Sequence, residues 1–237
     1  IIVFSLLLFP LLIALGFWQL ERAEEKREIL KEFNLNQQLP PATFEDLMME
    51  RNHQYRSIWL TGKLDGKRRV FLDNRVKYGK PGYEVVEAMK VSEFYSKGRQ
   101  QLVLVNRGWV PASLDRRILP TIDSIKGDLQ LRGTLYRNLR GGYRLDDGII
   151  KIKEWPSRVG WISIDRAEEL FGDEFFAYQL RLDTDSPGAL DTGWVTVAVQ
   201  PEKHTGYAVQ WFVMAIVLLI MTLVANSNIG SWNKSKG

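Results

Sequence analysis

Two long apolar runs lie at the ends of the chain, on either side of a mixed polar middle. The first, Ile1–Leu20, has no charged residue, and the second, Tyr207–Ala225, is almost wholly apolar. A helix needs roughly 20 residues to cross the apolar core of a bilayer, because each residue adds about 1.5 Å. We therefore predict transmembrane helices over 1–20 and 207–225, a middle domain over 21–206 and a tail over 226–237.

The flanks of these runs bear on how the chain lies in a membrane. Pro10 is compatible with a membrane helix. No A-x-A-like cleavage site precedes the charged stretch ERAEEKRE, so we expect an uncleaved anchor, with a cleaved signal peptide as the alternative. Two spans place both termini on one side, and the tail carries Lys234 and Lys236 without an acidic residue. The positive-inside rule then predicts a cytoplasmic tail and an extracytoplasmic middle domain.

The middle segment opens with helical patterning. The stretch FWQLERAEEKREILKEF (17–33) carries an apolar stripe at helical spacing, so we expect it to continue the first span as a helix that ends within 34–41. A short helix is predicted over 43–50. Its signal is Thr43 as N-cap with Asp46 three residues later, which approximates a capping box.

Strand patterning dominates the remainder of the middle segment. A single helix is predicted within it, over 165–172, capped by Asp165 and stopped by Gly172. Many short strands in one segment predict a predominantly antiparallel sheet that curls into a barrel or sandwich. The fold class is therefore a membrane α+β protein, with two transmembrane helices bracketing one β domain with short helices. The expected strands are 57–64, 68–75, 83–91, 101–110, 129–136, 159–164, 176–182 and 194–199.

Composition excludes several kinds of chemistry. The chain has no cysteine and only two histidines, so disulfides, thiolate metal sites and three-histidine sites are impossible. The net charge is +4, but basic and acidic residues alternate along the sequence and form no basic stripe. We therefore expect no nucleic-acid partner.

Catalytic motifs are also lacking. We find no glycine-rich phosphate loop, HExxH or G-x-S-x-G motif. Asp146 and Asp147 are read as turn residues, and His53 as a solvated loop residue before the first strand. We therefore expect that the protein is not an enzyme.

Six stretches, in this order, resemble the Surfeit-locus (Shy-type) cytochrome c oxidase assembly factors of bacteria and mitochondria. The resemblance covers nearly the whole chain, and the order of the stretches between two spans makes it specific. One departure is the strand YEVVEAMKV, where members often carry a proline after the apolar run. The stretches are LGFWQLERAEEK (15–26), YRSIWLTGKL (55–64), LVNRGWVP (104–111), LRGTL (131–135), GWISID (160–165) and HTGYAVQWF (204–212).

The resemblance implies a respiratory-chain chaperone of the bacterial inner membrane, multi-pass, with its main domain facing the periplasm. Its implied role is to bind haem a and assist its insertion into the catalytic subunit of cytochrome c oxidase. The implied partners are that subunit, haem a synthase or other assembly factors, and the lipid bilayer. The histidine of the HxxYAxQWF motif, proposed as iron ligand in bacterial members, corresponds here to His204.

Helix geometry is consistent with a ligand role for His204. Pro201 is favoured at the first position of a helix, which would put Gln200 at the cap and His204 in the first turn. The positive end of the helix dipole favours the neutral imidazole, the form that ligates iron. Trp211 lies two turns further along and is expected to pack against a macrocycle held at His204.

Neighbouring side chains complete the expected haem site. We expect Tyr207 and Ala208 on the face of His204, and Lys203 and Arg22 as partners for the haem propionates. The alternative is that the aromatic residues here are only interfacial belt residues, which favour the membrane boundary because they are amphipathic. That set is Phe17, Trp18, Tyr207, Trp211 and Phe212.

Other motifs have structural interpretations. We interpret Arg107 and Trp109 of LVNRGWVP as parts of a corner at a strand end, more readily than as a partner contact. Trp18, Arg22 and Lys26 share one helix face that would receive a partner helix or the protein's own domain. Two rival functions therefore remain beside haem handling: a cofactor-free scaffold that clamps oxidase subunits or other assembly factors, and an enzyme acting on haem or a quinone.

Overall fold

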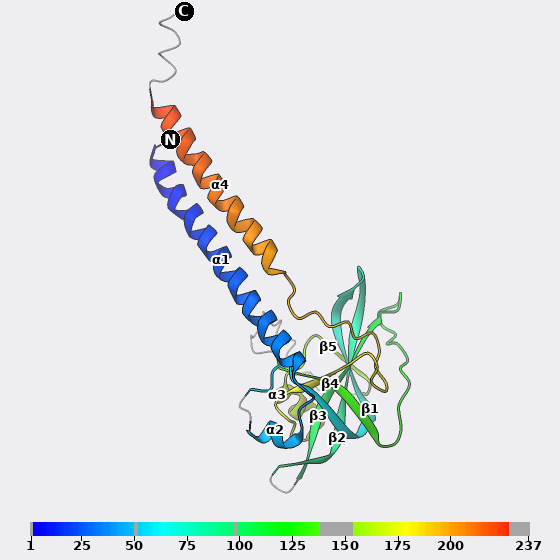
Figure 1. Cartoon of the computed structure of the whole chain (residues 1–237). Helices are drawn as coiled ribbons and strands as arrows, with labels where there is room; N and C mark the ends of the chain where they lie inside the picture. Colours follow the sequence, from blue (N-terminus) through cyan, green and yellow to red (C-terminus); the bar gives the residue numbers. More distant parts are fainter. Residues whose placement is uncertain (1, 50–51, 97–98, 138–153, 228–237) are drawn as a thin grey trace, which may run out of the picture. The chain divides into compact units, whose positions relative to one another are not determined.

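The computed structural model describes residues 2–49, 52–96, 99–137 and 154–227. The predicted turn at Asp146–Asp147 and the tail lysines lie outside these residues. Two compact units make up the chain, one formed by the terminal segments 1–32 and 195–237 and the other by 33–194 (Figure 1).

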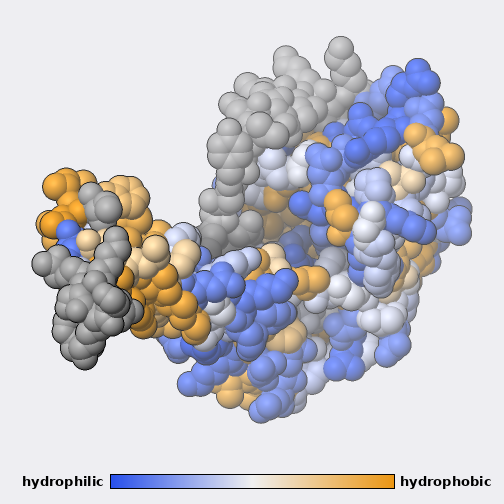
Figure 2. Space-filling view, turned by 90° about the horizontal axis from the view of Figure 1, so that it is seen from above, coloured by the Kyte–Doolittle hydropathy of each residue, from blue (hydrophilic) through white to orange (hydrophobic). Residues whose placement is uncertain are grey.

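Two long helices form the terminal unit: α1 (Ile2–Gln38) and α4 (Pro201–Asn226). They lie side by side in Figure 1, and each contains a segment long and apolar enough to cross a bilayer. Figure 2 shows hydrophobic residues gathered over these helices, while hydrophilic residues dominate the visible face of the β domain. The expected two candidate transmembrane helices are therefore confirmed.

Helix α1 ends at Gln38, within the segment 34–41 where its end was expected. Its polar last turn, 34–38, is still helical. Asn36 donates a hydrogen bond to the Gln54 carbonyl at 2.8 Å, and Gln37 donates to the Tyr55 carbonyl at 3.0 Å. These tertiary contacts hold the last turn in place, so the polar composition of the segment does not end the helix.

The shorter helices follow their capping residues. Helix α2 spans Phe44–Met49. At its start, the Thr43 amide donates to the Asp46 carboxylate at 2.8 Å, and the Asp46 amide donates to the Thr43 hydroxyl at 3.2 Å. This confirms the capping box. Helix α3 (Ile164–Phe171) has its N-cap two residues before the expected one. Asp165 lies in the first turn, and Ser163 is the actual N-cap.

The strands of the middle unit form one sheet with the order β2-β3-β6-β4-β1-β5 (Figure 1). A further pairing of β2 with β1 closes five of them into a ring, and β5 is attached to β1 outside that ring. Most neighbours are antiparallel, while β3–β6 and β1–β5 are parallel. The prediction of a mostly antiparallel, barrel-like sheet is confirmed. The strands are β1 (Ser57–Lys77), β2 (Lys80–Ser96), β3 (Arg99–Pro111), β4 (Leu129–Tyr136), β5 (Ser157–Val159) and β6 (Gln179–Leu182).

Three strand predictions need correction. The runs 57–64 and 68–75 form one continuous strand, β1, whose pairing register with β2 shifts between Leu64 and Arg69. The run 159–164 contributes only Val159 to a strand. The segment 194–199, although β-branched and apolar, is not a strand at all.

Alternating side chains of the strands fill the inside of the ring. In β4 every second residue from Leu131 to Leu135 is buried. The same inward positions of β1, β3 and β6 supply apolar side chains to one core cluster, which includes Ile58, Leu60, Val103, Val105, Leu180 and Leu182. Burial of each such side chain stabilises the fold by about 1.5–3 kcal/mol.

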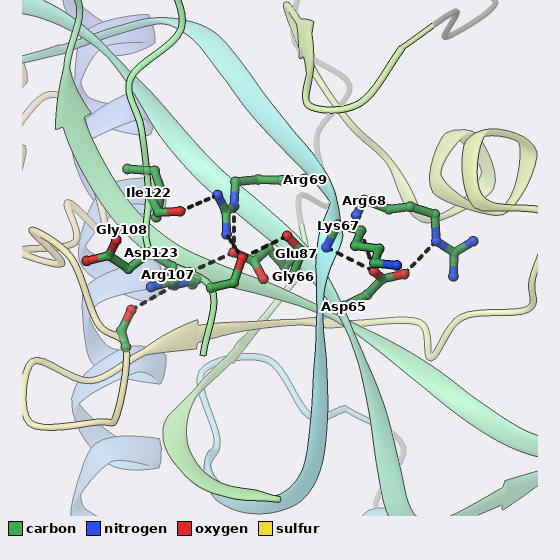
Figure 3. A network of polar contacts seen from close by, with 12 residues as sticks. Asp65, Gly66, Lys67, Arg68, Arg69, Glu87, Arg107, Gly108, Ile122 and Asp123 are labelled. Carbon is green, nitrogen blue, oxygen red and sulfur yellow. Dashed lines mark hydrogen bonds and ion pairs between the residues drawn. The ribbon is translucent and has the colours of Figure 1, made fainter. Parts of the chain in front are cut away.

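A buried charge network fastens two irregular segments to the sheet (Figure 3). Glu87 of β2 is fully buried and accepts hydrogen bonds of 2.7 Å from Arg69 and Arg107 on the neighbouring strands. Arg69 also donates to the Ile122 carbonyl at 2.7 Å, and Arg107 to the Gly188 carbonyl at 2.8 Å. The segments that follow β3 and β6 are thus held by the same carboxylate.

A second cluster in Figure 3 lies at the bend of β1. Asp65 accepts from the Arg68 side chain at 2.5 Å and from the Lys67 amide at 3.2 Å. Burial alone would raise the pKa of Asp65, but these hydrogen bonds outweigh it and hold the pKa below its usual value. The cluster therefore stabilises the bend with Asp65 ionised.

We predict that Glu87→Ala lowers the free energy of unfolding of the full chain in detergent by about 3–5 kcal/mol, because it leaves two buried guanidinium groups without their carboxylate. The matched control is Asp115→Ala, which removes an exposed partner of Arg117 and should change stability by no more than about 0.5 kcal/mol. Urea unfolding followed by near-ultraviolet circular dichroism measures both. Equal effects of the two substitutions would contradict the role given to Glu87.

Candidate functional site

The two long helices meet along a stripe of mostly small residues. On α1 the buried positions are Ser5, Leu12, Gly16 and Ala23, and on α4 they include Ala208 and Ala215. Several are seven residues apart, the spacing that keeps one face toward a partner helix. We call these positions, with the side chains that lie between them, the helix seam.

Gly16 makes room for an aromatic ring in the seam. A Cβ atom on Gly16 would lie 2.5 Å from the Phe212 ring, so any side chain there displaces the ring. Phe212 also meets Phe17 edge-on, with ring centroids 5.4 Å apart. The aromatic residues of the HTGYAVQWF stretch are thus partly used in packing the two helices together.

Polar contacts join the helices at three levels. Near one end, the Ser5 and Thr222 hydroxyls lie 2.7 Å apart. Near the other end, Arg27 donates to the Thr205 hydroxyl at 3.0 Å. The third contact, between Gln19 and His204, lies between these levels along α1 and one residue from Thr205 on α4. Such bonds fix the pairing of apolar helices, which have little hydrophobic reason to associate within lipid.

One ring nitrogen of His204 makes a hydrogen bond, and the other makes none to the residues that the structure describes. Its Nδ1 lies 2.8 Å from the Gln19 side-chain oxygen. Its Nε2 is screened from solvent and has no hydrogen-bond partner among the residues that the structure describes. With the amide oxygen of Gln19 turned toward it, Nδ1 is the nitrogen that donates, and in the neutral ring Nε2 then keeps its lone pair.

The other expected site residues are only partly gathered around His204. Trp211 is half-buried two turns along α4, as the spacing predicted. Ala208 is fully buried in the seam, and Tyr207 is half-exposed. Lys203 is exposed beside His204 in the chain.

Arg22 already has partners in this structure. It forms an ion pair with Glu25 at 2.6 Å and lies 5.8 Å from the centre of the Trp18 ring. Its side chain is 45% exposed, so the ion pair is weak and exchangeable.

Gln19 is the functional candidate that sequence reasoning missed. The sequence motifs assign it no role. The available signal was the seven-residue repeat, since Ser5, Leu12 and Gln19 fall on one line of the helix. A polar residue in that line of an apolar helix indicates a polar partner on the facing helix.

His53 is not a solvated loop residue, which corrects that interpretation. It is 8% exposed, and its ring lies 5.4 Å from Tyr178 and 6.2 Å from Phe176, measured between centroids. The polar sequence around it concealed this aromatic contact, which depends on residues far along the chain. His53 is therefore part of the β-domain core.

The LVNRGWVP stretch is structural, but it is not a turn. It lies within β3, where Val85 pairs with Gly108 and Val86 with Asn106, so Arg107 is the extra residue of a bulge. The bulge directs Arg107 into the buried network around Glu87. The Trp109 indole donates to the Arg75 carbonyl at 2.8 Å. Both side chains thus make their hydrogen bonds inside the domain.

The described part of the β domain offers little else for chemistry. The described residues contain no group of three or more histidine, cysteine, aspartate or glutamate side chains that could hold a metal ion. Arg181 is the most unusual cation, stacked 3.4 Å from the centre of the Tyr136 ring. Burial lowers its pKa, and Tyr136 and Glu84 oppose this shift. His204 therefore remains the strongest single ligand candidate.

Comparison with known proteins decides the family. The family model of the SURF1 family matches residues 6–216, which span both long helices and the β domain. The chain belongs to the SURF1 family. This is known as a family of oxidase assembly factors and not as an enzyme family. The resemblance drawn from the sequence motifs is therefore confirmed.

Relatives of this SURF1-family chain are similar over nearly their whole length. A SURF1-like protein of Rickettsia felis is 25% identical over 232 residues, covering 94% of this chain and 96% of the relative. One from Rickettsia conorii is 24% identical over 228 residues, covering 91% and 87%. A third, from Rickettsia bellii, is 22% identical over 232 residues, covering 95% and 90%.

We predict that the helix seam can be trapped by a disulfide. The chain has no cysteine, so Ser5→Cys with Thr222→Cys should cross-link rapidly under mild oxidation, measured by the gel shift on reduction. Adding Gly16→Leu should slow this about tenfold or more, because overpacking costs about 1–3 kcal/mol.

The matched control is Gly206→Leu, since a Cβ at Gly206 meets nothing within 4 Å. It should leave the cross-linking rate unchanged. A rate that is unaffected by Gly16→Leu, or equally reduced by Gly206→Leu, would contradict the packing described for the seam.

Proposed function

We propose that this SURF1-family protein binds haem a and assists its insertion into the catalytic subunit of cytochrome c oxidase, with His204 as an iron ligand. The single observation that carries the proposal is the bare Nε2 of His204, in a chain whose family consists of oxidase assembly factors. An imidazole nitrogen with a free lone pair is a common axial ligand of haem iron.

The state of His204 fits this group. A buried polar atom without a partner destabilises a protein by roughly 1–3 kcal/mol, so it needs an explanation. Ligation would satisfy Nε2 while Nδ1 keeps its bond to Gln19. A ligating histidine typically donates its other ring proton to an oxygen in this way.

Other residues would hold the rest of the macrocycle. Trp211, half-buried on the same side of α4, offers an aromatic surface. Lys203 is exposed and available to a propionate, and Arg22 would exchange Glu25 for one at little cost. Tyr207 lies beside this group with half of its side chain exposed, where it would cover an edge.

The proposed setting is the bacterial inner membrane. Two candidate spans at the ends of the chain support a multi-pass protein. The proposed orientation, with both ends in the cytoplasm and residues 21–206 in the periplasm, rests on the tail lysines and the positive-inside rule. Haem a synthase or other assembly factors would then be partners within the same bilayer.

The second candidate function is a scaffold without a cofactor. The observation that favours it is the direct packing of the Phe212 ring on Gly16, which joins the helices through their own residues. Such a helix pair could clamp oxidase subunits through its exposed apolar faces alone.

We predict that His204→Ala removes most haem a from the protein, because it deletes the ligating nitrogen. The measurement is the haem-a absorption per folded protein, purified in detergent from cells that make haem a. His53→Ala is the matched histidine control and should leave this ratio unchanged. Equal haem content in the parent and His204→Ala would refute the ligand assignment and favour the scaffold.

We predict the topology from reporter fusions. A cytoplasm-active reporter fused after Gly237 should be active, and a periplasm-active reporter inserted between Lys97 and Gly98 should also be active, because two spans return the chain to its starting side. Activity of the periplasm-active reporter at Gly237 would overturn the orientation.

A further inference from the structure

We propose that Gln19 is a positioning residue that fixes the tautomer of His204, so that Nε2 always presents its lone pair. This inference rests on the proposed ligand role of His204, but its central claim concerns the protein without haem. It assigns to α1 a direct part in the chemistry of a residue on α4.

The contact itself dictates the tautomer. The Gln19 oxygen lies 2.8 Å from Nδ1 of His204, and an oxygen of this kind cannot donate a proton. In this orientation of the amide, the neutral ring carries its hydrogen on Nδ1 and its lone pair on Nε2. In a free histidine side chain the other tautomer, with the proton on Nε2, is the commoner one. Gln19 thus selects the less common form.

The seam keeps Gln19 in place. Gly16 and Ala23 lie one turn before and one turn after it on α1, and both are buried. On α4, Ala208 lies one turn after His204 and is completely buried. These small, buried side chains hold the two helices close together on either side of the Gln19–His204 contact. A rotation of either helix would break the hydrogen bond, so the helix pairing and the tautomer are coupled.

The opposite nitrogen has no competing partner in the described part of the chain. Nε2 of His204 is screened from solvent and makes no hydrogen bond there. If the imidazole adopted the other tautomer, Nε2 would bury an unpaired donor, and the Gln19 oxygen would face a lone pair on Nδ1. Both changes are unfavourable in an apolar setting. The arrangement is therefore stable only with the lone pair on Nε2.

The direct test is the ring nitrogen spectrum of the haem-free protein. The chain contains only two histidines, so ¹⁵N-histidine labelling gives two sets of ring signals, and His204→Ala identifies the set that belongs to His204. In detergent micelles, from cells that make no haem a, the parent should show a protonated Nδ1 and a pyridine-like Nε2. Gln19→Leu should shift the His204 signals toward the Nε2-protonated form.

The matched control is Gln38→Leu, which makes the same change at an exposed residue of α1. It should leave the His204 signals unchanged. A parent spectrum with the proton on Nε2, or one that Gln19→Leu does not alter, would overturn the proposal. Either result can be read whether or not the protein binds haem.

A second readout uses protein purified with haem a. Gln19→Leu should weaken haem retention roughly 10- to 100-fold, as is usual when the partner of a ligating histidine is removed. Gln19→Glu, which keeps an acceptor, should restore retention and lower the haem reduction potential, because a carboxylate makes the imidazole a stronger electron donor. Weak retention in both variants, with the tautomer shift present, would overturn the link from tautomer to iron.

The two experiments separate the two proposals. If the parent carries no haem but shows the Nδ1-protonated ring, the proposed function fails and the role of Gln19 in the tautomer stands. If haem depends on His204 but the tautomer does not depend on Gln19, the proposed function stands and the positioning role fails.

Discussion

The polar contacts of the terminal unit depend on the small residues that α1 and α4 present to each other. Gly16, Ala23 and Ala208 remove side-chain volume where the helices meet, so the Phe212 ring packs on Gly16 and Gln19 lies within hydrogen-bond distance of His204. Within lipid, where apolar helices gain little from burying one another, such packing and a few hydrogen bonds decide whether two helices pair. The same residues that join the helices therefore also orient the only imidazole in this unit.

In the β domain, buried charged side chains hold irregular segments against the sheet. Long irregular segments follow β3 and β6 and contain no strand of their own. Arg69 and Arg107, both bound to Glu87, hydrogen-bond to these segments and so hold them against the sheet. Two cations around one buried carboxylate leave a net positive charge in the interior, which is stable only while every donor is satisfied. The bulge at Arg107 shows how the backbone is adapted to that requirement.

The sequence was most informative where one local signal decided the structure. The apolar ends, the Thr43–Asp46 capping box and the alternation in 129–136 were all predicted with nearly correct bounds. Failures came where contacts distant in sequence decide. His53 is buried by Tyr178 and Phe176, and the apolar run 194–199 finds no neighbouring strand. At the candidate site, His204 stood out as a rare residue type in a recognised motif, whereas Gln19 gained meaning only when the facing helix was in place.

The closed ring of strands also limits how the β domain can recruit another protein. A flat sheet offers unpaired backbone groups at its edges, and a partner can bind there by adding a strand of almost any sequence. In this domain β1 pairs with β4 over Ser57–Gly62 and with β2 from Gly62 onward, and the short β5 lies along Val70–Leu72. Most of the backbone pairing along β1 is thus used within the domain, so a protein that contacts this strand would meet mainly side chains, which vary with sequence.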